Sequence, residues 1–189
     1  HPMNRFFKLS LTVAAAALTL GAQAADYPAA GKTITIVVPF AAGGPTDKVA
    51  RDLAEALRKP LGGATVVIDN AAGAGSTIGT AKVFRANPDG YTLLVTHIGI
   101  ATTPALYRKL PYKVDEFEFA GLINEVPMVV VGKPSLAANN WGELKTWLVE
   151  NKGKANLANA GLGAASPLCG LMLMQALQTE LTTVPYKGT

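Results

Sequence analysis

The sequence contains few of the residue types that most often carry chemistry. Of its 189 residues, one is cysteine and two are histidine, and aromatic residues make up 7%. The single Cys169 excludes a protein built on a disulfide framework. His97 is the only histidine beyond residue 24, and no other ligand type follows it at a metal-binding spacing. We therefore expect no metal site.

Charge is also sparse and evenly spread. Charged residues are 16% of the chain, and 17 Lys and Arg stand against 13 Asp and Glu, which gives a formal net charge of +4. No basic stripe interleaved with aromatic residues occurs, so we expect no nucleic-acid partner. The hydrophobic share of 49% is too high for a disordered chain. The length allows one domain or a divided pair.

The first 24 residues have the pattern of an export signal. Arg5 and Lys8 form a basic region, residues 9–20 are an uncharged apolar run, and residues 22–24 (Ala-Gln-Ala) are a small-residue cleavage site. The apolar run is shorter than the roughly 20 residues of a spanning helix. We expect cleavage before Ala25. His1 and Pro2, which precede the first methionine, are interpreted as an addition from cloning.

Beyond this leader, strand and helix patterns alternate. We predict strands over residues 34–40, 64–69, 91–96, 117–124, 128–133, 155–160 and 182–186. We predict helices over residues 47–57, 77–86, 141–149 and 166–177, with a shorter one in 103–112 and Asn140 as a cap. This alternation predicts an α/β fold whose sheets are mainly parallel, with right-handed crossovers.

A change in composition near residues 124–127 is the predicted boundary between two lobes. We assign residues 25–124 to the first lobe and 125–189 to a second, partial lobe. The second part holds only about two strand and helix units, and the chain ends where we expect a strand to continue into a loop. We interpret the chain as truncated at its C-terminus.

Three junctions share one form, in which a buried strand is followed by small residues and a helix start. They are residues 40–47 (FAAGGPTD), 70–77 (NAAGAGST) and 160–167 (AGLGAASP). The first N–H groups of a helix lack partners and carry a partial positive charge, so such an end binds anions. None of the three loops contains Lys or Arg. This favours a carboxylate, held by amides and the hydroxyls of Thr46, Ser76 and Ser166, over a polyphosphate.

Structural interpretations of the same residues remain open. Small residues are common wherever a helix starts, and Asp47 could cap its helix instead of facing a ligand. His97 ends the third strand, where open α/β sheets place ligands, but it could equally be a packed loop residue. As a general base it would have no paired nucleophile, so we predict no catalytic residue.

Nucleotide cofactors are not expected either. Gly73, Gly75 and Gly79 form G-x-G-x-x-x-G, which is one residue off the dinucleotide fingerprint and follows the second strand instead of the first. Neither a phosphate loop of the G-x-x-x-x-G-K-[ST] type nor a G-x-S-x-G elbow is present. An exported chain also meets little nicotinamide cofactor or ATP.

Several motifs in fixed order resemble the solute-binding receptors of tripartite tricarboxylate transporters, the Bug family. They are residues 34–47 (ITIVVPFAAGGPTD), 70–80 (NAAGAGSTIGT), 87–94 (NPDGYTLL), 105–112 (ALYRKLPY) and 184–188 (VPYKG), after an export signal. The resemblance implies a periplasmic binding protein whose two α/β lobes close on a small carboxylate. It further implies that Pro167 stands where relatives often have His, and that relatives continue past Thr189.

The resemblance also implies a ligand site formed by opposed loops, with a contribution from residues 96–102. Carried over residue by residue, it comprises Ala41, Gly43, Gly44, Thr46, Asp47, His97, Gly161, Gly163, Ala165 and Ser166. We expect a non-enzymatic, monomeric receptor without cofactor that delivers a small organic carboxylate to membrane permease subunits. The alternatives are an exported α/β hydrolase or transferase, and a nonfunctional receptor fragment.

Overall fold

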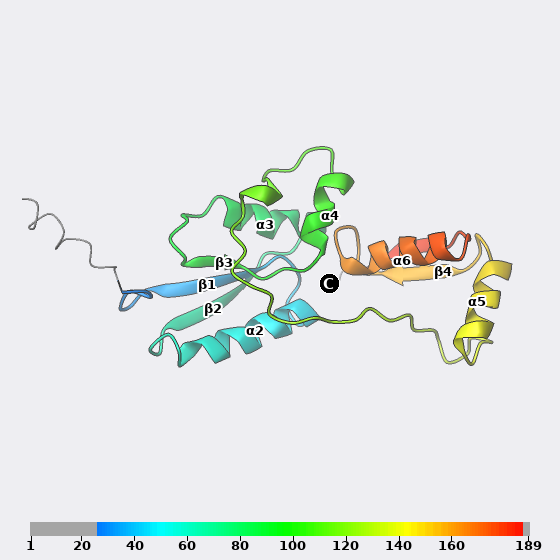
Figure 1. The fold of residues 1–189 in the computed structure, drawn as a ribbon, viewed down its shortest axis with the longest axis horizontal. Helices are drawn as coiled ribbons and strands as arrows, with labels where there is room; N and C mark the ends of the chain where they lie inside the picture. The colour runs from blue at the N-terminus through cyan, green and yellow to red at the C-terminus, as the bar shows by residue number, and fades with distance from the viewer. Residues whose placement is uncertain (1–25, 187–189) are drawn as a thin grey trace, which may run out of the picture.

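The computed structural model describes residues 26–186 and has two parallel sheets with flanking helices (Figure 1). The predicted leader, its cleavage site and the last residues of the VPYKG motif lie outside the described residues. The elements are β1 Thr33–Val38, α2 Pro45–Arg58, β2 Thr65–Asn70, η2 Ala74–Ser76, α3 Thr77–Phe84, β3 Thr92–Leu94, α4 Gly99–Leu106, η3 Val114–Glu116, α5 Trp141–Glu150, β4 Asn156–Asn159, α6 Ala165–Ala176 and β5 Thr182–Pro185.

The first sheet has the strand order β2-β1-β3, and β1 pairs in parallel with both neighbours. Because β1 is central, it is buried on both faces, as its continuous apolar sequence predicts. Ile36, Val37 and Val38 have no exposed surface. The prediction of a mainly parallel α/β fold is confirmed.

Helices cover both faces of this sheet. Ile34, Ile36 and Val38 form a core cluster with Ala50 and Ala54 of α2. Since side chains alternate along a strand, the residues between them face the other side, where α3 packs (Figure 1). The carboxyl ends of all three strands therefore meet at one edge, from which the first-sheet loops of the predicted site emerge.

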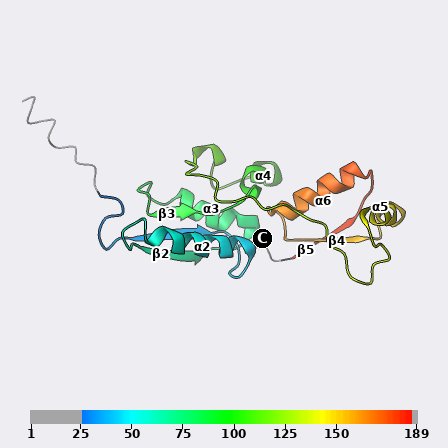
Figure 2. The same cartoon turned by 60° about the horizontal axis from the view of Figure 1, so that its bottom comes forward.

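The second sheet is smaller and consists of β4 and β5 in parallel, with α6 packed along it (Figure 2). Leu148 of α5, Ala155 and Leu181 are its buried core. The predicted cap of α5 is confirmed, because the Asn140 side chain accepts a hydrogen bond from the Glu143 amide at 3.0 Å. No helix in residues 26–186 combines the length and the apolar character that crossing a bilayer requires.

The prediction of strands over residues 117–124 and 128–133 is wrong. Both segments belong to an extended connection between the first sheet and α5 that lacks regular secondary structure (Figure 1). Their apolar side chains are exposed, with Leu122 at 78% and Val131 at 85%. An apolar run forms a strand only when a neighbouring strand completes its hydrogen bonds, and within residues 26–186 none does. The lobe boundary between residues 124 and 125 falls inside this connection and stays a prediction.

The helix predicted in residues 103–112 begins earlier, at Gly99. Pro104 lies inside it, where its missing N–H would leave the Ile100 carbonyl without a donor. The Thr103 hydroxyl donates to that carbonyl at 2.8 Å and replaces the missing bond. Thr103 is fully buried and also accepts a hydrogen bond from the Tyr112 hydroxyl at 3.2 Å. This compensation allows the helix to include a proline that, in the sequence, predicts a boundary.

Candidate functional site

A buried carboxylate holds the loop between β1 and α2. Asp47 lies in the first turn of α2 and is 2% exposed. Its carboxylate accepts hydrogen bonds from the Gly43 amide at 2.8 Å, from Arg51 Nε at 2.9 Å and from Asn70 Nδ2 at 2.9 Å. The donors, Arg51 first and the Gly43 amide second, lower the pKa of Asp47 to about 2.

This arrangement bears on the two interpretations of Asp47. The N-cap position of α2 is occupied by Gly44, which has no side chain to cap with. Asp47 instead reaches back from within the helix to the loop amide, and both of its oxygens are engaged by protein donors. Its role in shaping the loop is therefore visible, whereas its contact with a ligand stays a prediction.

Two partners of Asp47 were missed by sequence reasoning. Asn70 ends β2, and its amide also donates to the Phe40 carbonyl at 3.2 Å, while Arg51 contacts the Asn70 side-chain oxygen at 3.3 Å. The network thus ties the first glycine loop to the start of the second. The spacing of four residues between Asp47 and Arg51 could have indicated their ion pair.

Neutral groups hold the corresponding loop of the second sheet, between β4 and α6. The Asn159 side chain accepts a hydrogen bond from the Gly161 amide at 2.9 Å. The Ser166 hydroxyl oxygen accepts one from the Ala160 amide at 2.8 Å, which leaves the Ser166 proton available to another acceptor. Gly161 and Gly163 have φ angles of +93° and +88°, which favour glycine.

Within residues 26–186, three buried side-chain atoms that follow β2 and β3 have no hydrogen-bond partner. They are Ser76 Oγ, Thr96 Oγ1 and His97 Nε2. Ser76 is 2% exposed and follows β2, while Thr96 and His97 follow β3. All three therefore lie beyond the carboxyl ends of strands, at the edge where open α/β sheets bind ligands. A buried polar atom without a partner costs free energy of folding, so each of these three atoms is a candidate for a hydrogen bond with a ligand or water.

The surroundings of His97 fix which nitrogen carries its proton. Its ring stacks on Phe40, with centroids 4.6 Å apart, and its Nδ1 accepts a hydrogen bond from the Gly99 amide at 3.0 Å. Burial lowers the pKa of His97, which favours the neutral ring. A neutral imidazole that accepts at Nδ1 carries its proton at Nε2. The unpartnered Nε2 is therefore a hydrogen-bond donor.

The second and third glycine loops meet in the structure. At Gly75, Gly99 and Gly163 an added Cβ would collide with backbone atoms of another loop. For Gly163 these include the Gly75 Cα, which would lie 3.1 Å away. The Tyr107 hydroxyl donates to the Ala74 carbonyl at 2.9 Å and joins the end of α4 to the same region. The predicted contribution of residues 96–102 includes Gly99 without giving it a role, and sequence reasoning had not linked Tyr107 to the site.

The predicted site residues fall into two groups. Gly163 and His97 both lie against Gly99, since a Cβ added there would collide with the Gly163 carbonyl oxygen and with the His97 ring. The remaining residues flank the helix starts: Ala41 and Gly43 are exposed, Asp47 is buried, and Gly44, Thr46, Gly161, Ala165 and Ser166 are half-buried. First-turn amides of α2 and α6 have no partner within their helices. Which of these residues contact a ligand stays a prediction.

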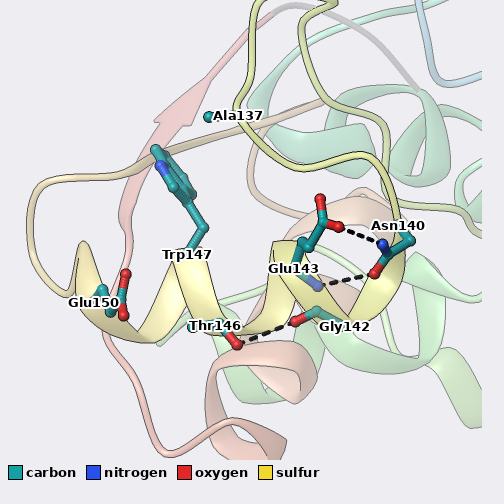
Figure 3. Close-up of a pocket in the computed structure, with 7 residues that line it drawn as sticks. All are labelled: Ala137, Asn140, Gly142, Glu143, Thr146, Trp147 and Glu150. Atoms are coloured by element: carbon teal, nitrogen blue, oxygen red, sulfur yellow. Dashed lines mark hydrogen bonds between the residues drawn. The ribbon is translucent and has the colours of Figure 1, made fainter.

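Two surface hollows lie elsewhere. One, of about 540 Å³, lies beside α5, where Figure 3 shows Asn140 and Glu143 bonded to each other and Thr146 donating to the Gly142 carbonyl at 3.2 Å. These groups are satisfied by the cap and first turns of their own helix. The other, of about 520 Å³, is lined by residues that include Pro104, Tyr112 and Phe119. Neither hollow includes a predicted site residue.

Comparisons with known proteins agree on one family. The model of the tripartite tricarboxylate transporter family receptor matches residues 49–189. A UPF0065 protein from the TAR-I ttuE–ttuC′ intergenic region of Agrobacterium vitis is 46% identical over 98% of this chain and 53% of its own length. The chain thus spans about half the length of this relative.

Solved structures give the same result. The periplasmic binding protein BugD is 47% identical with a TM-score of 0.69, over 84% of this chain and 53% of BugD. MatC (Rpa3494) from Rhodopseudomonas palustris, solved with bound malate, is 36% identical with a TM-score of 0.75, over 84% of this chain and 54% of MatC. The predicted resemblance is confirmed: the chain belongs to the tripartite tricarboxylate transporter receptor family, together with the Bug proteins.

Proposed function

We propose that this chain captures a small organic carboxylate in the periplasm and delivers it to the permease subunits of a tripartite tricarboxylate transporter. The observation that carries the proposal is the set of unpartnered buried atoms Ser76 Oγ, Thr96 Oγ1 and His97 Nε2. Carboxylate oxygens accept hydrogen bonds from two hydroxyls and one imidazole N–H. The ligand would supply the partners that these groups lack.

Hydrogen bonds to a charged ligand are strong even without a cation. A hydrogen bond to a charged group contributes about 1.5 to 3 kcal/mol, so three donors contribute roughly 5 to 9 kcal/mol. Micromolar binding corresponds to about 8 kcal/mol. Unpartnered amides in the first turns of α2 and α6 would add to this sum. The absence of Lys and Arg from the three loops is therefore compatible with a carboxylate ligand.

The relatives support the class of ligand and the location. BugD is a periplasmic binding protein, and MatC was solved with malate. Malate is a small dicarboxylate, so it is the first ligand to test. Action as a monomer and the division into lobes at residues 124 and 125 belong to the same proposal.

The chemistry of His97 argues against the alternative of a hydrolase or transferase. A histidine that serves as general base usually donates its Nδ1 proton to an orienting group and accepts a proton at Nε2. In this chain Nδ1 accepts from the Gly99 amide, so Nε2 already carries the proton. His97 is thus prepared to donate to an anion and not to activate a nucleophile.

Isothermal titration calorimetry tests the proposal. We expect binding of malate or another small carboxylate from a panel, and no binding of malamide, which has the same skeleton without charge. Thr96→Val keeps the shape of the side chain and removes one donor, which corresponds to a roughly 10- to 100-fold loss of affinity. Thr183→Val, at an exposed position of β5, is the matched control. A folded chain that binds no member of the panel would refute the proposal.

A further inference from the structure

The contact between the second and third glycine loops is made by backbone against backbone. A Cβ on Gly75 would meet the Leu162 carbonyl oxygen, and a Cβ on Gly163 would meet the carbonyl of Gly75. A Cβ on Gly99 would meet the Gly163 carbonyl oxygen. A flexible side chain could move aside, but a backbone carbonyl moves only with its loop. The three glycines therefore permit an approach that any larger residue would prevent.

The contact joins parts of the chain that belong to different sheets. Gly75 follows β2 and Gly99 begins α4, both around the first sheet, whereas Gly163 lies between β4 and α6 of the second. The Gly163 loop contacts both of the other two segments. We infer that this contact is the docking contact that closes the second sheet's loop over the ligand site, with Gly75 and Gly163 as positioning residues for binding.

Closure and ligand capture use the same surface. Ser76, which carries a buried unpartnered hydroxyl, directly follows Gly75. The Gly99 amide holds the His97 ring, and the Gly163 carbonyl lies against Gly99. Two of the three donors are thus adjacent to the docking contact. This inference rests on the proposed function for its effect on affinity, but the contact itself can be tested without a ligand.

Backbone strain is the main alternative explanation for two of these glycines, and the chain offers controls for it. Gly75 and Gly163 have φ angles of +57° and +88°, so alanine there is strained whatever surrounds it. Gly62 and Gly153 have φ angles of +64° and +71°, and an added Cβ at either meets nothing within 4 Å. Gly75→Ala paired with Gly62→Ala, and Gly163→Ala paired with Gly153→Ala, therefore separate collision from strain.

Small-angle X-ray scattering on the ligand-free chain and its four variants tests the contact. We expect a larger radius of gyration for Gly75→Ala and Gly163→Ala than for their controls, since the two sheets can no longer approach. Circular dichroism during heating checks that each pair has comparable folded content. If both docking variants match their controls in size, the inference is overturned. If they are larger, the contact is supported even when no carboxylate binds.

Calorimetry then tests the coupling to ligand. With a carboxylate that binds the unmodified chain, we expect Gly75→Ala and Gly163→Ala to lose at least tenfold in affinity relative to Gly62→Ala and Gly153→Ala. Equal affinity within each pair would overturn the role of these glycines in binding. An unmodified chain that binds no carboxylate would refute the proposed function, while the scattering result would still decide whether the contact exists.

Discussion

The loops that precede α2 and α6 have the same form but are stabilised by different chemistry. The first is held by a buried carboxylate, because Asp47 accepts from the Gly43 amide and pairs with Arg51. The second is held by neutral groups, because Asn159 accepts from the Gly161 amide and Ser166 from the Ala160 amide. A strand, a run of small residues and a helix start therefore do not determine how such a loop is fixed.

The comparison also shows which hydrogen-bond donors already have partners within the protein and which do not. In each loop one glycine amide is already engaged by a side chain of the protein, Gly43 by Asp47 and Gly161 by Asn159. In the first loop, the Gly43 amide already donates to the Asp47 carboxylate, although the family resemblance assigns Gly43 to the ligand. The donors without partners lie instead on Ser76, Thr96 and His97. We therefore expect the loops to frame the ligand site and these three residues to supply hydrogen bonds to the ligand.

Removing the Asp47 carboxylate should destabilise the first loop and give the largest loss in the free energy of unfolding. Asp47→Ala leaves the Gly43 amide and the Asn70 side chain without their acceptor. We expect a loss of about 2 to 3 kcal/mol in the free energy of unfolding, measured by urea denaturation. The loss stays below the roughly 3 to 5 kcal/mol of a fully buried pair, since Arg51 is 53% exposed and can be solvated.

Asp52 provides the control for this substitution. It pairs with Lys48 in the same helix, but both side chains are mostly exposed. Asp52→Ala should therefore change the free energy of unfolding by less than about 0.5 kcal/mol. Equal effects of the two substitutions would mean that burial and the loop amide contribute nothing to the role of Asp47.

Acid should remove the same stabilisation without a mutation. The pKa of Asp47 falls from an ordinary 3.8 to about 2 in the folded chain. Because the folded value is the lower one, the stabilisation is complete above the unfolded pKa and is lost as pH falls toward about 2. The difference in unfolding free energy between the unmodified chain and Asp47→Asn should shrink over this range. A difference that is constant with pH would contradict the ionised state of Asp47.

Sequence alone predicted the parts of the fold that depend on local patterns. The continuous β-branched run of β1 and the spaced apolar residues of α2 indicated both elements. A strand buried on both faces gives a continuous apolar run, and a helix packed on one face gives a regular apolar spacing. The same reasoning failed in residues 117–133, where apolar runs indicated strands. A strand depends on a partner, and local sequence does not reveal whether one is present.

The site was predicted as a set of loops but not as a set of contacts. Strand ends followed by small residues indicated the three loops, since a helix start exposes amides wherever it occurs. The hydrogen bonds by which Asn70 joins two of the loops and the contact of Gly99 with Gly163 were missed. These contacts come from the approach of segments far apart in the chain. Resemblance to the family drew attention to residues 96–102 but not to the unpartnered hydroxyl of Thr96.

The neutral loop should respond less than the charged one and without pH dependence. Ser166→Ala removes the acceptor of the Ala160 amide. We expect a loss of about 1 kcal/mol in the free energy of unfolding, constant between pH 7 and pH 3, measured by urea denaturation without ligand. Ser135→Ala, at an exposed position, is the control. A loss that changes with pH would indicate that a charged group also holds this loop.

The smallest change in stability, combined with a change in binding, is expected at Thr46. This residue is half-buried in the first turn of α2, next to Asp47, where helix amides lack internal partners. Thr46→Val keeps a β-branched shape of similar helix propensity, so the free energy of unfolding should change by less than about 0.5 kcal/mol. If the Thr46 hydroxyl donates to the carboxylate, calorimetry should show a loss of affinity of about tenfold. An unchanged affinity would remove Thr46 from the site. The first loop would then have a structural role only, fixed by Asp47, and the ligand would be held by the residues that follow β2 and β3.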